Sequence, residues 1–453
     1  MTHYDFLIIG GDAAGMSAAS QARRTDESMS IAVLEKGPHV SYAACGMPYL
    51  IGGKIDDPAQ LIAIDQKAYV QKRKIEILKQ TEAVSVDFTS KRVTIRSGDK
   101  ESLLEYEKLL IATGARPFVP PMEGIGSDGV FFLRALSEGI AIREYISGNN
   151  PSSGVIIGGG FIGLEMAEAL RNLGMKTTIL ERLASVAMTM SPEIRGLVKN
   201  SLRAGGVDVR TGVTVQSIGP RGNRRVVETD SGSFDADFIL VSVGIIPNTD
   251  FLQGTELAMT ERGAVIVDEQ SRTSIPGVFA AGDCATAKSL ITGKNVYIPL
   301  GTTANKQGRV AGLQAAGIKD ETFPGVVGSQ MVKVFDLEVG KTGLNAEDAV
   351  REGITPASTT IAWKSRAGYC PEAANILVNL TVDAGTGKVI GGEVAGTDGA
   401  ALRMDIIAAA VTAGMKIDQV AYLDLGYAPP FSPVWDPINA AAQKLKREIA
   451  RKA

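Results

Sequence analysis

The stretch SYAACGMPYLIGG, residues 41–53, places Cys45 in a loop rich in glycine, proline and aromatic residues. A cysteine thiolate can attack a sulfur atom of a disulfide, or it can be oxidised to a sulfenic acid. The chain has three cysteines, too few for a disulfide scaffold, and no second cysteine stands beside Cys45. Cys45 therefore cannot store two electrons in an internal disulfide, and it must pair with a small thiol or with oxygen.

Two segments share a plan that is typical of nucleotide binding. Each has an apolar strand, a glycine turn and a helix, followed by a second strand that ends in a glutamate. In such βαβ units the helix N-terminus faces a pyrophosphate, and the acid accepts hydrogen bonds from a ribose. The first unit has Asp12 in place of the middle glycine, whereas the second unit is complete. The residues concerned are Gly10, Gly15 and Glu35 in the first unit and Gly158, Gly160, Gly163 and Glu181 in the second.

Further apolar strands also end in glycine turns. EKLLIATGARP, with Thr113 and Gly114, and ADFILVSVGIIPNTD, with Gly244, suit a chain that crosses between two nucleotide-binding domains. TSIPGVFAAGDCA ends at Gly282 and Asp283, where an acid can hold the hydroxyls of a sugar-like chain. Nearer the C-terminus, ILVNLTVDAGTGKVIGGEVAG predicts a hairpin, and GAALRMDIIAAAVTAG predicts an amphipathic helix.

Length and composition bound the class of protein. The 453 residues, with 45% hydrophobic residues and 51 glycines, suffice for about three globular domains of about 100–200 residues each. A formal net charge of -3 and the lack of a Lys/Arg run argue against a nucleic-acid partner. The first residues show no signal peptide, and glycines and acids interrupt the longest apolar segment, so we expect a cytoplasmic protein without membrane contact.

In their order along the whole chain, these motifs resemble the pyridine nucleotide-disulfide oxidoreductases, flavoproteins with two dinucleotide-binding units. The resemblance implies an α/β fold with two Rossmann-like dinucleotide-binding domains and a C-terminal α+β dimerisation domain. Residues 1–115 and 250–322 would form a discontinuous FAD-binding domain. Residues 116–249 would form the NAD(P)H-binding domain. Residues 323–453 would form the dimerisation domain, through which two chains would pair as a homodimer with shared active sites.

The same resemblance assigns FAD to the first glycine unit and the nicotinamide nucleotide to the second. It places Asp283 at the ribityl side of the flavin, and it places the helix predicted for YIPLGTTANKQGRVAG, with Ala304, beside the flavin. Ser41, which opens the cysteine motif, is grouped with the cofactor-binding residues. No metal ligands are expected.

The loop of Cys45 indicates the branch of the family. It resembles the single-cysteine motif Ser-Phe-x-x-Cys-x-x-Pro-Tyr-x-x-Gly of coenzyme A disulfide reductases, persulfide and polysulfide reductases, NADH oxidases and NADH peroxidases, with Tyr42 in place of Phe. In the oxidase and peroxidase branches a histidine lies in the first glycine loop, where this chain has Ala13. We therefore expect reduction of coenzyme A disulfide or of a related persulfide or polysulfide through a mixed disulfide of Cys45.

Two C-terminal stretches carry the expected proton donor. LDLGYAPPFSPVWDP resembles the segment of coenzyme A disulfide reductases whose tyrosine reaches the other subunit's active site, a role that falls to Tyr427. RAGYCPEA resembles a Tyr-Tyr-Pro segment, in which Tyr369 is kept and Cys370 replaces the second tyrosine. Cys370 is either a neutral replacement in a tight turn or a second redox thiol near the partner subunit's Cys45.

Substrate and nucleotide preferences rest on single charges. Arg23 and Lys54, with Arg24 beside them, are candidates for binding the phosphates of coenzyme A. Glu181 favours NADH because it accepts the ribose hydroxyls, while Arg182 could offer a 2'-phosphate a cation, so some use of NADPH is expected.

Other functions remain open at this stage. An NADH oxidase forming water or peroxide would use Cys45 as a sulfenic acid, a ferredoxin or rubredoxin reductase would not need Cys45, and a redox sensor would bind FAD and NADH without turnover. The disulfide reductase requires Cys45 as a thiolate, so we expect its pKa to lie below the usual value of about 8.5.

Overall fold

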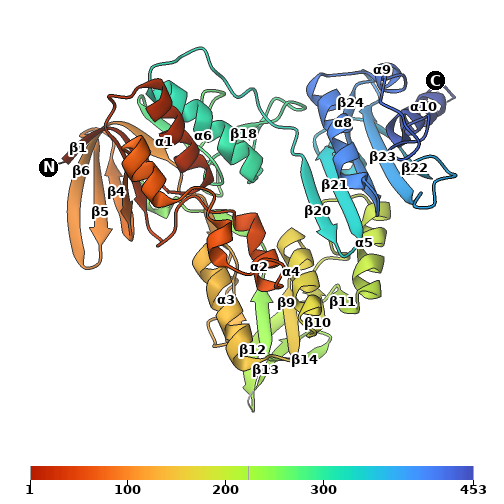
Figure 1. Cartoon of the computed structure of the whole chain (residues 1–453), viewed down its shortest axis with the longest axis horizontal. Coiled ribbons are helices and arrows are strands. Elements are labelled where there is room, and N and C mark those ends of the chain that lie inside the picture. The colour runs from red at the N-terminus through yellow and green to blue at the C-terminus, as the bar shows by residue number, and fades with distance from the viewer. Residues whose placement is uncertain (1, 223, 452–453) are drawn as a thin grey trace.

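The computed structural model describes residues 2–222 and 224–451 and contains three large sheets with helices packed on them (Figure 1). The first sheet is parallel through β3, β2, β1, β6 and β17, and it continues with two antiparallel strands. The second half of its central strand β1, residues 6–9, is apolar and buried on both faces, as expected for a parallel strand covered by helices. In order, the strands are β3 (Glu76–Lys79), β2 (Ile31–Glu35), β1 (Thr2–Ile9), β6 (Lys100–Ile111), β5 (Arg92–Ser97) and β4 (Thr81–Asp87), with β17 (Val278–Ala280) paired to β6.

Helices α1 (Ala13–Thr25) and α6 (Gly301–Ala315) pack closely together beside this sheet. Glycines on α6 allow the approach, because a Cβ atom on Gly308 would lie 2.2 Å from the carbonyl oxygen of Ala14. Helix α6 begins within the stretch YIPLGTTANKQGRVAG, so the helix predicted there is confirmed.

The second sheet is fully parallel and repeats the plan of the first nucleotide unit. A separate antiparallel sheet of three strands is inserted in the chain between β11 and β15 of this sheet. The strands of the parallel sheet, in order, are β11 (Val207–Thr211), β10 (Lys176–Glu181), β9 (Ser153–Ile157), β15 (Phe238–Val241) and β8 (Val130–Phe131). The strands of the small sheet are β12 (Val215–Arg221), β13 (Arg224–Thr229) and β14 (Gly232–Ala236). The helices of this part of the chain are α3 (Leu136–Asn149), α4 (Phe161–Asn172) and α5 (Pro192–Ala204).

Two short strands join the first two sheets. β7 (Ala115–Pro117) pairs antiparallel with β16 (Ile245–Pro247), directly after the glycine turns of Gly114 and Gly244. Both glycines have positive φ, +65° and +127°. The two glycine turns singled out in the sequence therefore lead into paired strands.

The third sheet is antiparallel and carries the C-terminal helices on it. The predicted hairpin is confirmed as β23 and β24, and the predicted helix as α8. The strands, in order, are β20 (Gln330–Val334), β21 (Leu337–Gly343), β24 (Val389–Gly396), β23 (Asn375–Asp383) and β22 (Pro356–Lys364); the helices are α7 (Ala346–Arg351), α8 (Ala400–Thr412), α9 (Ile417–Val420) and α10 (Pro437–Ala450). The predicted fold class, α/β with two Rossmann-like units and a C-terminal α+β domain, is confirmed.

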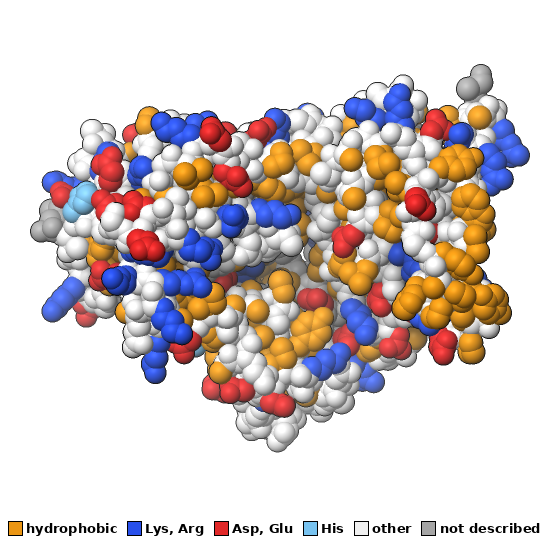
Figure 2. All heavy atoms as spheres, turned by 45° about the horizontal axis from the view of Figure 1, so that its top comes forward, with side chains coloured by type: hydrophobic (Ala, Val, Ile, Leu, Met, Phe, Trp, Pro, Cys, Tyr) orange, Lys and Arg blue, Asp and Glu red, His pale blue; other side chains and the backbone are white. Residues whose placement is uncertain are grey.

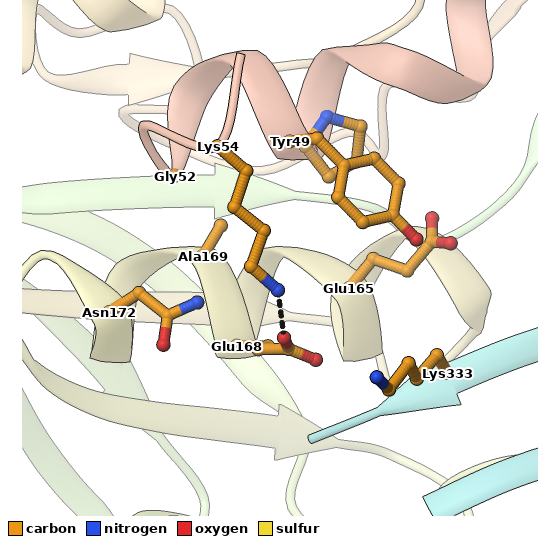
Figure 3. A pocket seen from close by; sticks show the side chains of 9 residues that line it. Tyr49, Gly52, Lys54, Glu165, Glu168, Ala169, Asn172 and Lys333 are labelled. Atoms are coloured by element: carbon orange, nitrogen blue, oxygen red, sulfur yellow. Dashed lines mark hydrogen bonds and ion pairs between the residues drawn. The ribbon is translucent and has the colours of Figure 1, made fainter. Parts of the chain in front are cut away.

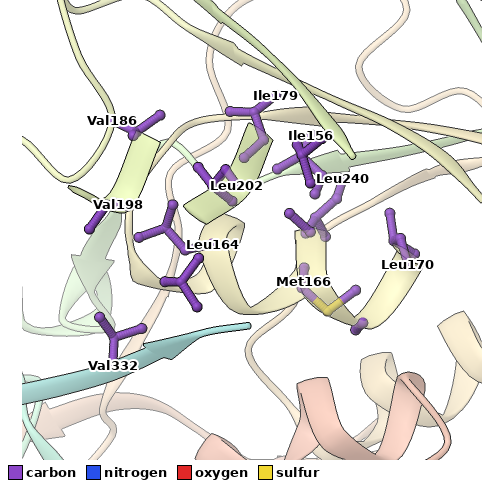
Figure 4. Packing of buried hydrophobic residues seen from close by; sticks show 14 of the residues in the cluster. Ile156, Leu164, Met166, Leu170, Ile179, Val186, Val198, Leu202, Leu240 and Val332 are labelled. Carbon is purple, nitrogen blue, oxygen red and sulfur yellow. The ribbon is translucent and has the colours of Figure 1, made fainter. Parts of the chain in front are cut away.

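One hydrophobic cluster connects all three parts of the chain. It includes Met47 and Leu50 from the Cys45 loop, the core of the second sheet, and Val332 from β20. Figure 4 shows Val332 facing the buried side chains of Leu164 and Val198. The packing fixes the Cys45 loop against helix α4. Among the described residues, no helix has the length and apolar character needed to cross a membrane.

Candidate active site around Cys45

Cys45 lies in a single 3₁₀ turn (Ala44–Gly46) that leads into the short helix α2 (Met47–Ile51). The residue is exposed, whereas Met47 and Leu50 behind it are buried. Gly46 permits close packing of the Leu61 side chain on this turn, because a Cβ atom at that position would lie 2.3 Å from Leu61 Cδ2. The sequence thus exposes a thiol on a firmly packed support.

The loop that precedes Cys45 is tied to the first glycine turn. The backbone N–H of Ser41 donates to the carbonyl of Gly11 at 2.8 Å, and that of Tyr42 donates to Oδ1 of Asp12 at 3.2 Å. Ser41 is buried with φ +52°, and its hydroxyl lies 3.1 Å from the hydroxyl of Tyr69. These bonds place Cys45 next to the N-terminus of α1.

Glu35 and Glu181 hold their glycine turns in the same way. Glu35 accepts the backbone N–H of Gly11 at 2.8 Å and of Gly37 at 2.6 Å. Glu181 accepts the N–H of Gly159 at 2.7 Å and of Leu183 at 2.7 Å. Each carboxylate oxygen keeps a further lone pair, so both acids can also accept ribose hydroxyls.

The glycines of both turns are needed for close backbone approach. A Cβ atom on Gly10 would lie 2.1 Å from the carbonyl oxygen of Ala112, and one on Gly15 would lie 1.9 Å from that of Gly10. Gly158 and Gly163 are equally confined, whereas a Cβ atom on Gly160 would meet no atom within 4 Å. The second turn therefore leaves open the approach that a pyrophosphate needs, and its residues fit a bound dinucleotide.

The first turn differs because Asp12 occupies the middle position. Burial raises the pKa of Asp12 to about 6, and the hydrogen bond from the Tyr42 N–H opposes that rise. Since this bond turns the carboxylate toward the Cys45 loop, the N-terminus of α1 stays available to a phosphate. The residues of the first unit therefore also fit a dinucleotide, FAD by the resemblance.

Arg134 is a site residue that sequence reasoning missed. It lies between β8 and α3, and its Nη2 donates to Oδ2 of Asp283, the acid expected at the flavin ribityl chain. Its Nε donates to the carbonyl of Ala115 at 3.2 Å. Gly282, before Asp283, has φ +82° and packs on Ala304 of α6. No motif marks Arg134, because it stands outside both glycine units.

The expectation of a lowered thiol pKa is wrong for the protein residues alone. Although Cys45 is exposed, the protein atoms around its thiol partly desolvate it, and this desolvation is the main cause that raises the pKa of Cys45. The negative charge of Glu165 raises this pKa further. Arg134 acts in the opposite direction and lowers it. The protein surroundings thus favour the thiol, and the positive charge that opposes this effect comes from Arg134.

Glu165, on α4, is a second residue that the sequence did not single out. Figure 3 shows its carboxyl group beside the hydroxyl of Tyr49, from α2. Both side chains line a hollow that also includes Lys333 of β20. Burial raises the pKa of Glu165 to about 7, and the neighbouring Glu168 adds to the rise. A carboxyl group that titrates near neutral pH therefore lies close to the reactive cysteine.

The two predicted substrate cations have defined partners. Lys54 forms an ion pair with Glu168 at 2.6 Å on the wall of the same hollow (Figure 3). Arg23 donates to five backbone carbonyls and is thereby committed to holding the loops after α1 and before β3. The five carbonyls belong to Asp26, Glu27, Met29, Arg73 and Lys74.

A cluster of other arginines lies near Arg23. Arg24 of α1 and Arg309 of α6 are exposed, and both donate to the side-chain oxygen of Gln21, at 3.3 and 2.8 Å. Arg73 lies over the ring of Tyr69, whose hydroxyl contacts Ser41 in the Cys45 loop. Sequence reasoning could not find this cluster, because its members come from three distant segments.

Tyr369 and Tyr427 come together in the C-terminal domain. Their side chains are 75% and 47% exposed, and a hydrogen bond with Tyr427 raises the pKa of Tyr369. Among the hydrogen bonds of the described residues, none joins either tyrosine to the Cys45 loop of the same chain.

The other two cysteines have different surroundings. Cys284 is fully buried, and its thiol lies 3.4 Å from the carbonyl oxygens of Ile111 and Ala281, so it is a packing residue. The thiol of Cys370 donates to the carbonyl of Pro429 at 3.2 Å within a turn.

Comparisons with known proteins agree with this architecture. The family described as pyridine nucleotide-disulphide oxidoreductase matches residues 4–308, and its dimerisation domain matches residues 329–437. A solved structure of a NAD-dependent persulfide reductase from A. fulgidus superposes with a TM-score of 0.95 at 39% identity, over 98% of this chain and 84% of that one.

Two curated relatives cover nearly the full length. The NAD(P)H sulfur oxidoreductase (CoA-dependent) of Pyrococcus furiosus is 38% identical over 97% of this chain and 98% of its own. The NADH oxidase of Methanocaldococcus jannaschii is 33% identical over 98% of this chain and 99% of its own. The chain has two glycine units, an exposed cysteine between these two units in the sequence, and a C-terminal dimerisation domain. It therefore belongs to the pyridine nucleotide-disulphide oxidoreductases and is an enzyme of their flavoprotein disulfide reductase type.

Proposed function

We propose that this enzyme uses NAD(P)H to reduce coenzyme A disulfide, or a persulfide or polysulfide of coenzyme A, through a mixed disulfide of Cys45. The observation that carries the proposal is the isolation of Cys45. It is an exposed thiol beside the FAD-type glycine turn, while Cys284 is buried and Cys370 lies in another domain. The names of the persulfide and sulfur reductase relatives support the same class of substrate. A reducing cytoplasm suits a thiol of this kind.

The proposed reaction balances with a single cysteine. The Cys45 thiolate attacks one sulfur of R–S–S–R', forming Cys45–S–S–R and releasing R'S⁻, which takes up a proton. Two electrons then cleave the mixed disulfide, returning the Cys45 thiolate and releasing RS⁻. Bound FAD would supply the two-electron chemistry that links NAD(P)H to this disulfide. With a persulfide R–S–SH in place of the disulfide, the corresponding products are a thiol and hydrogen sulfide.

The residues around Cys45 control its charge in this cycle. Glu165 and burial favour the neutral thiol, and Arg134 favours the thiolate. Because Arg134 also binds Asp283, the same guanidinium links the cysteine to the residue proposed to hold the flavin. We propose that Arg134 supplies the protein's part of thiolate stabilisation and that bound FAD supplies the rest.

A homodimer would complete the site. Figure 2 shows hydrophobic side chains gathered at the right of the molecule, over the C-terminal domain. Large exposed side chains there make an apolar surface of the kind that marks a protein interface. We propose that a second copy covers this surface and that Tyr427, with Tyr369, protonates the thiolate leaving Cys45 of the partner subunit. The exposed residues are Trp363, Tyr369, Leu402, Tyr427, Phe431, Val434 and Trp435.

The nucleotide preference and the coenzyme A site follow from charges. Glu181 at the second glycine turn favours NADH, and the exposed Arg182 permits some NADPH binding. For coenzyme A, the exposed Arg24 and Arg309 are better phosphate ligands than Arg23, whose donors are used by carbonyls. A series of side-chain contacts connects these arginines with the Cys45 loop: Arg73 lies over the ring of Tyr69, and the hydroxyl of Tyr69 contacts that of Ser41.

NADH oxidase activity is the second candidate, because the Methanocaldococcus jannaschii relative bears that name. It would use Cys45 as a sulfenic acid, reduced to the thiolate in each turnover. Ala13, where the oxidase and peroxidase branches have a histidine, offers no acid–base group for peroxide oxygen.

The test is the intact mass of the purified protein before and after dithiothreitol, with peptide mapping of Cys45. A mass loss equal to one coenzyme A, mapped to Cys45, is the expected result. Cys45→Ser should lose both the adduct and NADH-dependent reduction of coenzyme A disulfide, while Cys284→Ser, as the control, should keep both. Oxygen on Cys45, together with NADH-driven oxygen consumption at the rate of disulfide reduction, would favour the oxidase. Binding of FAD and NADH without turnover would favour a sensor.

A further inference from the structure

Arg403 connects the two segments that carry Tyr369 and Tyr427. It lies in the first turn of α8, and its side chain is 12% exposed. Its Nη2 donates to the carbonyl of Ser365 at 2.5 Å and to that of Phe431 at 2.7 Å. Ser365 lies shortly before Tyr369 in the chain, and Phe431 lies shortly after Tyr427. One guanidinium group therefore binds the backbone of both tyrosine segments.

The other donors of Arg403 fix the guanidinium itself. Its Nε donates to Oδ2 of Asp436 at 3.1 Å, and its Nη1 donates to the carbonyl of Gly399 at 3.1 Å. Asp436 is buried, and its Oδ1 caps helix α10 by accepting the N–H of Ile438 at 2.9 Å. A planar group with donors on several fixed acceptors has one orientation, so it can serve as a rigid anchor.

Direct contacts between the two segments are few. The N–H of Ala367 and the thiol of Cys370 both donate to the carbonyl of Pro429, at 3.1 and 3.2 Å. Both tyrosine side chains are exposed, and they lie near enough that Tyr427 raises the pKa of Tyr369. Both lie outside the regular helices and strands, so their placement depends on how the backbone of each segment is anchored.

We propose that Arg403 is the positioning residue of the Tyr369–Tyr427 pair, holding the two hydroxyl groups in the arrangement that serves the partner subunit's Cys45. This inference rests on the proposed function, in which the pair donates a proton to the departing thiolate. A proton donor must lie within hydrogen-bond reach of its acceptor, and a displacement of about 1 Å can cost roughly 100-fold in rate.

Arg403→Lys is the informative variant. A lysine keeps the positive charge and can still bind Asp436, but its single ammonium group cannot span the carbonyls of Ser365 and Phe431 in the fixed geometry of a guanidinium. Arg447→Lys is the matched control. Arg447 lies on α10 of the same domain and is exposed, and within the described part of the chain its side chain donates only to the carbonyl of Gln443 in its own helix.

The experiment compares these variants as FAD-loaded enzyme with NADH and coenzyme A disulfide. We expect Arg403→Lys to lower kcat by about 10- to 100-fold, with the rate of flavin reduction by NADH and the KM for NADH unchanged. Hydrogen exchange of the segments 365–374 and 424–436 should become faster, while exchange in the first two sheets should not change. Arg447→Lys should match the wild-type enzyme in every measurement.

A double-mutant cycle distinguishes positioning from general destabilisation. In the background of Tyr369→Phe and Tyr427→Phe, Arg403→Lys should cause no further loss of kcat, because the groups that it positions are already gone. An additional loss of similar size there, or wild-type exchange of both tyrosine segments, would overturn the role of Arg403 alone. Full turnover in the double phenylalanine variant would instead refute the proton-donor role in the proposed function, and the positioning role with it.

Discussion

Arg134, which precedes helix α3, donates a hydrogen bond from Nη2 to Oδ2 of Asp283, in the turn that follows β17 of the first sheet. The pair thus joins the two nucleotide-binding parts of the chain beside Cys45. Asp283 was expected to bind the flavin, and the structure adds a cation that holds this acid in place. The same cation lowers the pKa of the Cys45 thiol.

Arg134→Gln should make Cys45 less reactive. Loss of the positive charge leaves burial, Glu165, Asp283 and Asp12 to raise the thiol pKa without opposition from Arg134. We expect roughly three- to ten-fold slower alkylation of Cys45 by iodoacetamide at pH 7.5 in the FAD-loaded enzyme. Arg210→Gln, which removes an exposed arginine from β11, should leave the rate unchanged. Equal rates in both variants and the wild type would show that Arg134 does not act on the thiol.

Glu165→Gln should have the opposite effect on the same thiol. Glu165 has a pKa of about 7, raised by burial, so it is neutral at low pH and becomes charged as the pH rises through 7. That new negative charge raises the pKa of Cys45, so the alkylation rate of the wild type should increase with pH less steeply than that of the variant. We expect roughly two- to five-fold faster alkylation in the variant at pH 8 and similar rates at pH 6. A constant ratio across this pH range would contradict the coupling.

Arg23 and Arg24 are adjacent in sequence, but they should respond differently to substitution. Arg23→Ala removes donors from five carbonyls and should cost about 2 to 3 kcal/mol in the free energy of unfolding. Arg24→Ala should change stability by about 0.5 kcal/mol or less and raise the KM for coenzyme A disulfide roughly five-fold. Thermal unfolding and steady-state kinetics measure both effects.

Pantethine, a disulfide that lacks the adenosine phosphates, is the control substrate for this comparison. Because Arg24 would act on phosphate groups, its loss should not change the KM for pantethine. A similar increase for both disulfides would mean that Arg24 does not recognise the phosphates.

Features formed by consecutive residues could be predicted from the sequence, whereas contacts between distant segments could not. The two glycine turns, the strand ends at Glu35 and Glu181, and the helix α6 were predictable as local structure because each depends on a few consecutive residues. Arg134 and Glu165 come near Cys45 only because α2 packs against both α3 and α4, so no spacing in the sequence indicated them.

Arg23 shows the converse limit. Its charge suggested a phosphate ligand, yet the carbonyls that surround it come from the loop after α1 and the segment before β3. A sequence shows that a cation is present, but it does not show whether backbone acceptors already occupy its donors. The proposed exchange of tyrosines between subunits is likewise outside the reach of local patterns.

Glu181→Gln should shift the nucleotide preference toward NADPH. The amide removes the negative charge that repels a 2'-phosphate but keeps an oxygen for one of the N–H donors of Gly159 and Leu183. We expect the ratio of kcat/KM for NADPH to that for NADH to rise roughly ten-fold. Glu35→Gln is the matched control, because Glu35 holds the first glycine turn by the same pair of contacts. It should weaken retention of FAD and leave the nucleotide ratio unchanged, whereas a shift of that ratio by Glu35→Gln and not by Glu181→Gln would reverse the assignment of the two units.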